Sequence, residues 1–305
     1  LEGHPAIAEL HTVDRSWKRS GLVNQARHEG ALLSRLRERR YQLLVHLTDH
    51  WRGMWLSQAL RPRWSIAPVR ANRLWDWSFS HRYPFPQGTP RHTVELNLDA
   101  LRRVGLYPEE SEKRLVMVPG PEATQRVEAL LAQNQLATGG FIHVHPTSRW
   151  LFKAWTEDAY AELLRRLVRD GHRVVLTSAP DAREKSIAER ILAHAGAGVT
   201  DLSGRLTLRD MGALAARARL FFGVDSAPMH IAAAMGTPVV ALFGPSDERV
   251  WGPWKVPHRI VASSHTCRPC NIDGCGGGKV SECLTQLPVE RVHSAINELL
   301  AQPHG

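Results

Sequence analysis

Cysteine, long apolar runs and acidic residues are scarce in this sequence of 305 residues. Only four cysteines occur, all within residues 267–283, which excludes a disulfide-rich scaffold and is typical of a reducing compartment. No apolar run reaches membrane-spanning length, and neither a signal peptide, an internal repeat nor a low-complexity tract is visible. The composition is therefore that of a globular protein. The first residue is Leu and not Met, so we expect a fragment or a processed form.

The shortage of acidic residues leaves 39 Lys and Arg against 30 Asp and Glu, a formal net charge of +9. Residues 1–91 carry most of the excess, with 15 basic and 7 acidic side chains, and six of the ten tryptophans precede residue 80. Such an excess indicates an anionic partner, either nucleic acid, a membrane surface or a phosphorylated substrate. A solvated basic surface around an ordinary aromatic core is the alternative.

Alternating apolar runs and amphipathic segments predict an α/β fold. Strands are expected at residues 41–47, 64–69, 141–145, 172–176, 199–202, 220–222 and 239–243. Helices are expected at residues 21–40, 54–60, 92–104, 122–135, 156–169, 181–195, 208–217, 231–235 and 289–301. The aromatic and Pro-rich residues 72–90 are expected to form a loop or a surface element. Repeated βα units in the second half predict a parallel sheet covered on both faces, with residues 134–140 joining two domains, 1–135 and 140–305.

The turn at residues 223–230, Gly-Val-Asp-Ser-Ala-Pro-Met-His, joins a buried strand to a helix. Ligands bind at the carboxyl ends of strands in parallel sheets, and N–H groups at a helix start attract phosphate. Asp225, Ser226 and His230 are therefore candidates for holding a phosphorylated sugar or nucleotide. The alternative, in which Asp225 and Ser226 only cap the helix, fits the local pattern equally well.

Two further strand ends in the second half carry polar groups. Residues 145–155 supply two hydroxyls, an Arg and Lys153, which can hold a diphosphate without a metal, although a solvated loop is the alternative. Residues 178–185 supply acids that either accept from ribose hydroxyls or favour the first turn of a helix. The convergence of three strand ends predicts a nucleotide-type ligand along one edge of the sheet. Another polar cluster, residues 48–53, follows the strand expected at 41–47.

The cysteines have the spacing C-x2-C-x4-C-x7-C in a Gly-rich loop, which could bind a structural zinc through Cys267, Cys270, Cys275 and Cys283. Reduced structural thiols or adventitious disulfides are the alternative. No neighbouring His and acid in the sequence indicate a catalytic thiol.

Residues 224–234, with Phe-Gly-Pro-Ser-Asp at 243–247, resemble the signature of the bacterial heptosyltransferases of lipopolysaccharide core synthesis, glycosyltransferase family 9. Residues 145–149 with Lys153 and Trp155, the Cys loop, and residues 41–51 and 92–98 resemble the heptosyltransferase III branch, so the resemblance covers nearly the whole chain. It implies two facing Rossmann-like domains of the GT-B type. The N-terminal domain would bind the acceptor and the C-terminal domain the donor.

The resemblance further implies transfer of heptose from ADP-L-glycero-D-manno-heptose (ADP-heptose) to the lipid-linked inner core, with inversion and without a required metal. It places the protein on the cytoplasmic face of the inner membrane as a peripheral protein that binds no nucleic acid. Thr147, Ser148 and Lys153 would meet the diphosphate, and Lys153 would stabilise the departing ADP. The remaining donor residues would be Asp225 for the heptose, Ser226, Ala227 and His230 for the phosphates, Leu206 for the adenine and Glu184 for the ribose.

Two departures from the family pattern concern the site. Ala227 stands where many family members have Gly. The family also begins with a strand and a Gly-containing loop whose Asp is the proposed general base, and this sequence starts downstream of that unit. We therefore expect an incomplete first domain, a native base in residues absent here, and a chain that binds donor but turns over poorly.

Within the first half, Thr48, Asp49 and Arg52 are the acceptor-binding candidates, and Asp49 is the carboxylate nominated as base. Two other functions stay open. One is a related glycosyltransferase that uses another nucleotide sugar. The other is a basic, zinc-containing module that binds nucleic acid, although no nucleic-acid-binding motif is present.

Overall fold

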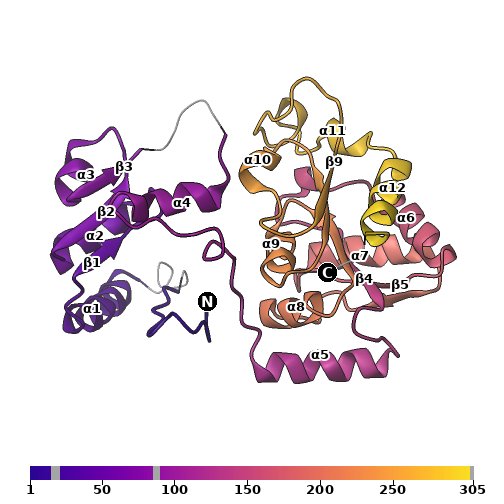
Figure 1. The fold of residues 1–305 in the computed structure, drawn as a ribbon, viewed down its shortest axis with the longest axis horizontal. Helices are drawn as coiled ribbons and strands as arrows, with labels where there is room; N and C mark the ends of the chain where they lie inside the picture. The colour runs from indigo at the N-terminus through magenta and orange to yellow at the C-terminus, as the bar shows by residue number, and fades with distance from the viewer. Residues whose placement is uncertain (15–20, 85–89, 303–305) are drawn as a thin grey trace. The chain divides into compact units, whose positions relative to one another are not determined.

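The computed structural model describes residues 1–14, 21–84 and 90–302 (Figure 1). The chain forms two compact units. The small unit is Ala8–Lys113, and the large unit combines Leu1–Ile7 with Arg114–Gly305. The domain joint expected at residues 134–140 instead lies inside the large unit. The reason is that Val127 and Leu131, on the helix before this stretch, pack against Phe141 in the core of the large unit.

The large unit is built on a parallel sheet with the strand order β6-β5-β4-β7-β8-β9. Its strands are β4 (Phe141–His145), β5 (Arg173–Leu176), β6 (Val199–Asp201), β7 (Leu220–Val224), β8 (Val239–Phe243) and β9 (His258–Ala262). The sequence predicted all of these except β9, which is one of the two edge strands. The order changes direction between β4 and β7, and this reversal is where parallel sheets bind ligands.

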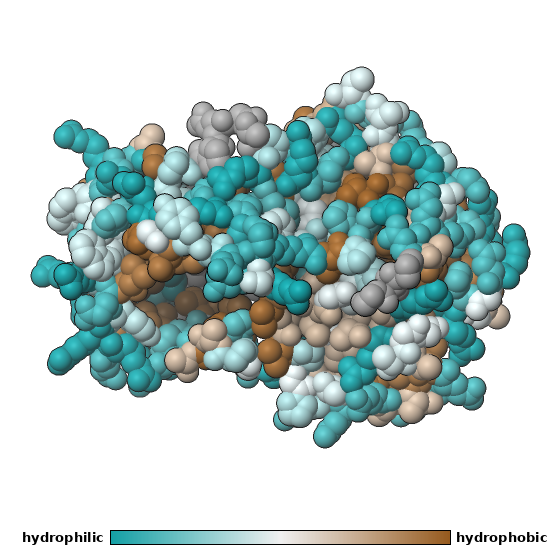
Figure 2. All heavy atoms as spheres, in the orientation of Figure 1, coloured by the Kyte–Doolittle hydropathy of each residue, from teal (hydrophilic) through white to brown (hydrophobic). Residues whose placement is uncertain are grey.

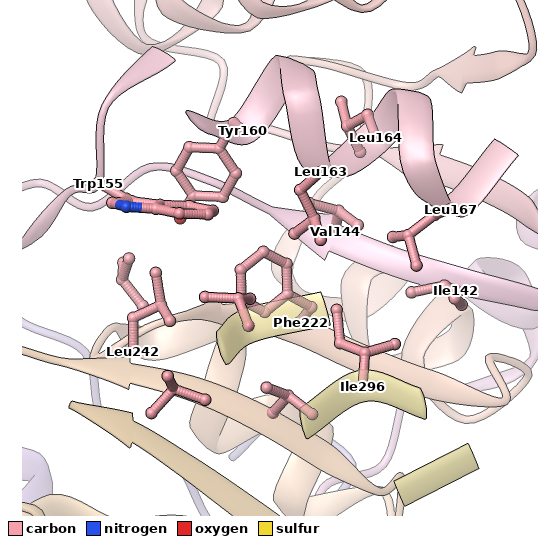
Figure 3. Close-up of a cluster of buried hydrophobic side chains, with 14 of the residues drawn as sticks. Ile142, Val144, Trp155, Tyr160, Leu163, Leu164, Leu167, Phe222, Leu242 and Ile296 are labelled. Carbon is pink, nitrogen blue, oxygen red and sulfur yellow. The ribbon is translucent and has the colours of Figure 1, made fainter. Parts of the chain in front are cut away.

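Helices cover both faces of this sheet, as the sequence predicts (Figure 1). One face packs against α6 (Glu157–Arg169), α7 (Ala182–Ala195) and α12 (Val289–Leu300), and the other against α5 (Pro121–Gln133), α8 (Leu208–Ala215) and α9 (Ala227–Ala234). Figure 3 shows Leu163 and Leu167 of α6 directed at the strand residues Val144 and Phe222. The large unit also contains the short helices η2 (Leu151–Lys153), α10 (Glu248–Trp251), η3 (Cys275–Gly277) and α11 (Glu282–Thr285).

Side-chain caps fix the starts of three helices that follow strands. Thr156 accepts from the Ala159 N–H at 3.3 Å, and Asp181 accepts from the Arg183 N–H at 3.0 Å. Thr207 forms a capping box with Asp210. Each side chain satisfies a backbone donor that the first helical turn leaves unpaired. The caps therefore define where each loop at the carboxyl edge of the sheet ends.

The small unit holds a parallel sheet with the order β1-β2-β3. Its elements are α1 (Leu22–Glu38), β1 (Leu43–Val45), α2 (Trp51–Leu60), β2 (Trp64–Pro68), α3 (Arg73–Ser78), β3 (His81–Tyr83) and α4 (Thr93–Arg102). Residues 72–90 were expected to form a loop or a surface element, and the loop interpretation is wrong over the first part, because the Asn72 side chain caps α3 and β3 pairs with β2. Residues 85–89 of that prediction, and Trp17, lie outside the described residues.

The strand β1 was expected to be buried, and the structure contradicts this. Leu43 and Val45 are 40% and 36% exposed, because β1 is the edge strand and α4 packs over β2 and β3 instead. Figure 2 shows hydrophobic side chains gathered on the small unit in the region of β1 and α2. Within the described residues, no helix combines the length and the apolar character needed to cross a membrane.

Candidate active site

A cavity of about 620 Å³ lies at the carboxyl edge of the large sheet, a size typical of small-molecule sites. Its walls come from the segments after β4, β5, β7 and β8 and from the start of α8. The nine residues predicted to contact the donor all line it, namely Thr147, Ser148, Lys153, Glu184, Leu206, Asp225, Ser226, Ala227 and His230. Parallel strands bring their carboxyl ends to one edge, which explains why motifs as far apart in sequence as residues 147 and 230 meet here.

Lys153 and Asp225 form an ion pair inside this cavity, with 2.6 Å between Nζ and Oδ2. Their side chains are 21% and 7% exposed, so the pair is largely shielded from water. Asp225 therefore has a partner from another loop, and it precedes the capping position of α9, which Ser226 occupies. The interpretation of Asp225 as a simple helix cap is wrong.

The start of α9 faces the cavity through Ser226, Ala227 and Pro228. The Ser226 hydroxyl donates to the Val224 carbonyl oxygen at 3.3 Å and does not cap the helix. Among the described residues, α9 therefore has no side-chain cap. The partial positive charge of a helix start is favourable for an anion. His230, one turn further along, also lines the cavity.

Glu184 lines the cavity from the first turn of α7 and is 9% exposed. Thr147 donates its hydroxyl proton to Glu184 Oε2 at 2.6 Å. Asp181, the other acid of this segment, only caps α7. Leu206, Leu208 and Met211 supply an apolar wall on the same cavity, which suits the face of a base.

Three buried polar residues lie at the floor of this cavity, and one of them, His145, is part of its lining. Thr177 Oγ1 is 2.8 Å from His143 Nε2 and 3.0 Å from His145 Nδ1, and His145 Nε2 is 3.4 Å from Thr147 Oγ1. Burial lowers the pKa of His143 to about 3, helped by His145, and lowers the pKa of His145 to about 4. Both imidazoles are therefore neutral near pH 7.

Sequence reasoning missed several cavity residues. Trp251 on α10 and Trp150 both line the cavity and are 43% and 53% exposed, with the Arg149 guanidinium 5.6 Å from the Trp150 ring. Trp251 follows β8, whereas the sequence prediction considered only the segments after β4, β5 and β7. Including the segment after the next strand would have found it. Thr177 follows β5 directly and could have been found in the same way.

In the small unit, Thr48 lines two cavities, of about 390 and 420 Å³, at the carboxyl ends of β1 and β2. Asp49 lines one of them and Arg52 the other. Arg52 makes two hydrogen bonds, of 3.1 and 2.5 Å, to the Glu29 carboxylate, so its charge is already paired.

Arg70, which the sequence did not single out, lies beside Asp49 in the small unit. Its guanidinium is 5.2 Å from the Trp51 ring and 5.4 Å from the Trp75 ring, and it donates to the Asp49 carbonyl oxygen. Cation–π contact with two rings holds the guanidinium in place, and no salt bridge to a carboxylate of the described residues is found for it. Arg70 is therefore better placed than Arg52 to meet an anion.

The four cysteines are free, with Cys283 buried and Cys267 and Cys275 exposed. Burial raises the pKa of the Cys283 thiol. Across the described residues, no group of three or more His, Cys, Asp or Glu side chains is arranged to hold a metal ion. The arrangement therefore does not fit the predicted zinc site.

A doubly wound parallel sheet with this cavity at its point of reversal defines a Rossmann-like unit of the kind found in GT-B glycosyltransferases. Residues 30–280 match the family described as glycosyltransferase family 9 (heptosyltransferase). The chain belongs to this family and is a glycosyltransferase.

Named relatives agree with this assignment. The chain is 32% identical over 268 residues to lipopolysaccharide heptosyltransferase 3 of Escherichia coli K12, covering 83% of this chain and 73% of the relative. A second E. coli heptosyltransferase 3 is 35% identical over 259 residues, covering 83% and 74%. Among solved structures, a family 9 glycosyltransferase from Veillonella parvula has a TM-score of 0.78 at 18% identity, covering 92% and 80%. E. coli heptosyltransferase WaaC with ADP has a TM-score of 0.68 at 18% identity, covering 93% and 81%.

Proposed function

We propose that this protein transfers heptose from ADP-heptose to the inner core of lipopolysaccharide, with inversion and without a metal. The observation that carries the proposal is the single cavity lined by all nine residues that the motifs assign to the donor. It offers hydroxyls, a cation and a helix start for a diphosphate, and an apolar wall for a base. The names of the heptosyltransferase 3 relatives support lipopolysaccharide as the acceptor.

Lys153 supplies the positive charge for the departing ADP in this proposal. Breaking the bond between the sugar and the diphosphate leaves negative charge on ADP, and a fixed cation stabilises the transition state more than the ground state. Asp225 keeps the Lys153 ammonium in the cavity and accepts hydrogen bonds from heptose hydroxyls. Ser226, Ala227 and His230 contact the phosphates at the start of α9.

The acceptor binds at the carboxyl ends of β1 and β2 in this proposal. Thr48 and Asp49 offer oxygen atoms for sugar hydroxyls there, and Asp49 is the carboxylate nominated to take the proton from the attacking hydroxyl. Because Glu29 already pairs with Arg52, we assign the contact with anionic acceptor groups to Arg70.

The decisive experiment combines the purified protein with ADP-heptose and inner-core lipopolysaccharide. We expect slow ADP release together with an acceptor heavier by one heptose, an anomeric configuration opposite to that of the donor, and a turnover rate that EDTA does not change. Thermal-shift assays with ADP-heptose, UDP-sugars and GDP-sugars separate this proposal from a related glycosyltransferase. Stabilisation by a uridine sugar alone would overturn the choice of donor.

We also propose that the protein works at the cytoplasmic face of the inner membrane as a peripheral protein. The small unit supports this, because Trp55 and Trp77 are 67% and 75% exposed and the first 91 residues carry most of the basic excess. Exposed tryptophans and basic side chains are the groups that bind the interface of an anionic bilayer.

A further inference from the structure

Five polar residues at the floor of the donor cavity and beneath it form a continuous chain of contacts. It runs from His143 on β4 through Thr177 after β5, back to His145 on β4, and on to Thr147 and Glu184. The strand geometry explains it. His143 and His145 are two residues apart and therefore project from the same face of the sheet. The register pairs Val144 with Leu176, which puts Thr177 beside His145.

The direction of the hydrogen bonds follows from counting protons. Each neutral imidazole carries one N–H, and each hydroxyl has one proton to donate. Among the described residues, His143 Nδ1 is buried without a partner. A buried orphan donor is rarer than an orphan acceptor, so the proton of His143 belongs on Nε2, where it is donated to Thr177.

The rest of the chain follows in the same direction. Thr177 then donates to His145 Nδ1 at 3.0 Å, in preference to the Val144 carbonyl oxygen at 3.3 Å. The proton of His145 is thereby placed on Nε2, facing the Thr147 oxygen, and Thr147 donates to Glu184 Oε2. Four hydrogen bonds thus point towards one carboxylate, and bonds aligned in this way strengthen one another.

Glu184 is the end of this chain that reaches the cavity. Thr147 occupies Oε2, which leaves Oε1 as the acceptor that no hydrogen bond found among the described residues uses. A carboxylate accepts hydrogen bonds and repels phosphate. In a nucleoside diphosphate sugar, the donors it can meet on the nucleoside are the ribose hydroxyls and the amino group of the base.

We propose that His143, Thr177 and His145 are positioning residues that aim Glu184 at the ribose hydroxyls of the donor. Recognition of the ribose then depends on three buried side chains, of which only His145 lines the cavity. The inference rests on the proposed use of an ADP-linked donor.

Thr177→Val tests it, because valine has nearly the shape of threonine and removes only the hydroxyl that joins the two imidazoles. Calorimetry would measure the Kd for ADP, 2′-deoxy-ADP and 3′-deoxy-ADP. We expect the variant to bind ADP roughly tenfold more weakly and the deoxy analogues with little change, so its preference for the intact ribose collapses. Thr177→Ser restores the hydroxyl and should restore the preference.

Thr237→Val is the matched control. Thr237 is also a buried threonine of the large unit, and its hydroxyl donates to the Ala215 carbonyl oxygen at 2.7 Å. This variant should lose stability but keep the ribose preference of the wild type. If Thr177→Val does not fold by circular dichroism, His143→Leu takes its place, because His143 does not line the cavity and the change also removes a contact with Thr177.

The outcomes separate this inference from the proposed function. A wild-type protein that does not bind ADP would contradict the ADP-linked donor itself. The positioning chain alone would be overturned if the wild type prefers the intact ribose and the Thr177→Val variant keeps the same ratio of Kd values for the deoxy analogues and ADP. Inosine diphosphate keeps the ribose and lacks the amino group of the base, so its Kd should change in the variant as the Kd for ADP does. A variant that loses only the distinction between ADP and inosine diphosphate would show that Glu184 meets the base.

Discussion

Lys153 and Asp225 carry opposite charges in one shielded cavity, so changing either residue alters the surroundings of the other. We expect Lys153→Ala and Asp225→Ala each to lower kcat/KM by at least tenfold. The double variant should lower kcat/KM by much less than the product of the two single reductions. The shared ion pair is removed by either change alone, and paired residues typically couple by about 0.5–3 kcal/mol.

Steady-state kinetics on all four proteins measures this coupling. Arg190 and Glu157 form an exposed ion pair in the large unit, so removing them is the control and should leave kcat/KM unchanged. Additive losses at Lys153 and Asp225 would mean that the two residues act independently.

The buried imidazoles make stability depend on pH. In the folded protein the pKa values of His143 and His145 are about 3 and 4, below the ordinary value near 6.5. Below about pH 6.5 the unfolded chain therefore binds protons that the folded chain does not, and stability falls as the pH falls towards these values. Between pH 6.5 and 4.5 we expect a loss of up to about 1.4 kcal/mol per pH unit for each imidazole.

Urea unfolding at half-unit pH steps measures this slope. His143→Leu should flatten it, while His194→Gln, a change at an exposed histidine, should leave it unchanged. A slope that is the same in all three proteins would show that the buried imidazoles do not cause it.

At the residue scale, sequence predicted the donor cavity well because its residues lie in short motifs at strand ends. Sequence could not show that Asp225 pairs with Lys153, 72 positions away, or that Glu29 pairs with Arg52. Such pairings depend on how loops from different strands meet. The prediction therefore favoured Arg52 over Arg70, whose two tryptophan neighbours become visible only in three dimensions.

Two glycines in helices of the small unit should respond in opposite ways to the same change. A Cβ on Gly53 in α2 would lie 2.2 Å from the His46 ring, which stacks on Phe79 at 5.8 Å. Gly53→Ala should therefore destabilise the protein by about 1–3 kcal/mol, the range typical of overpacking. Gly30 in α1 has open space around its Cβ position, and alanine is the better helix former.

Gly30→Ala should accordingly raise stability by up to about 1 kcal/mol. Thermal and urea unfolding of both variants beside the wild type tests the pair. Equal effects of the two changes would show that the ring of His46 moves aside without cost.

At the element scale, the helices whose caps stand in the sequence, at Thr156, Asp181 and Thr207, were predicted closely. The elements that were missed are short. The helix α3 and strand β3 lie in an aromatic, Pro-rich segment, and β9 is an edge strand whose residues are mostly only half-buried. Length and periodicity carry the signal, and such short segments offer little of either.

At the scale of the whole molecule, the basic excess lies mainly in one stretch of the chain, and that stretch includes the exposed Trp55 and Trp77. We expect the protein to bind vesicles that contain anionic lipid and to bind neutral vesicles more weakly. The affinity for anionic vesicles should fall at least severalfold between about 50 and 500 mM salt, because salt screens the attraction between the charges.

Vesicle sedimentation measures this binding. The double variant Trp55→Ala and Trp77→Ala should bind the vesicles several times more weakly than the wild type. Alanine at the buried Trp155 is not a suitable control, because it would disturb the core. Trp251→Ala, in the large unit, is the matched exposed change. Equal loss from both variants would argue against the small unit as the membrane-binding surface.

The division into units was only partly predictable. The sequence predicted two domains joined at residues 134–140, whereas the two compact units of the structure meet between Lys113 and Arg114. The helix α5 has an ordinary amphipathic pattern, and its sequence does not show which sheet it covers. Only the packing of Val127 and Leu131 assigns it to the large unit.

The small unit begins after Ile7 and ends at Lys113, and the chain on both sides of it belongs to the large unit. Within residues 1–305, the small unit is thus joined to the large unit at two points. Under the proposed function, a chimera that exchanges the small unit between two heptosyltransferases would carry over the choice of acceptor and leave the choice of nucleotide unchanged. Enzymes with new pairings of donor and acceptor would then require no redesign of the donor cavity.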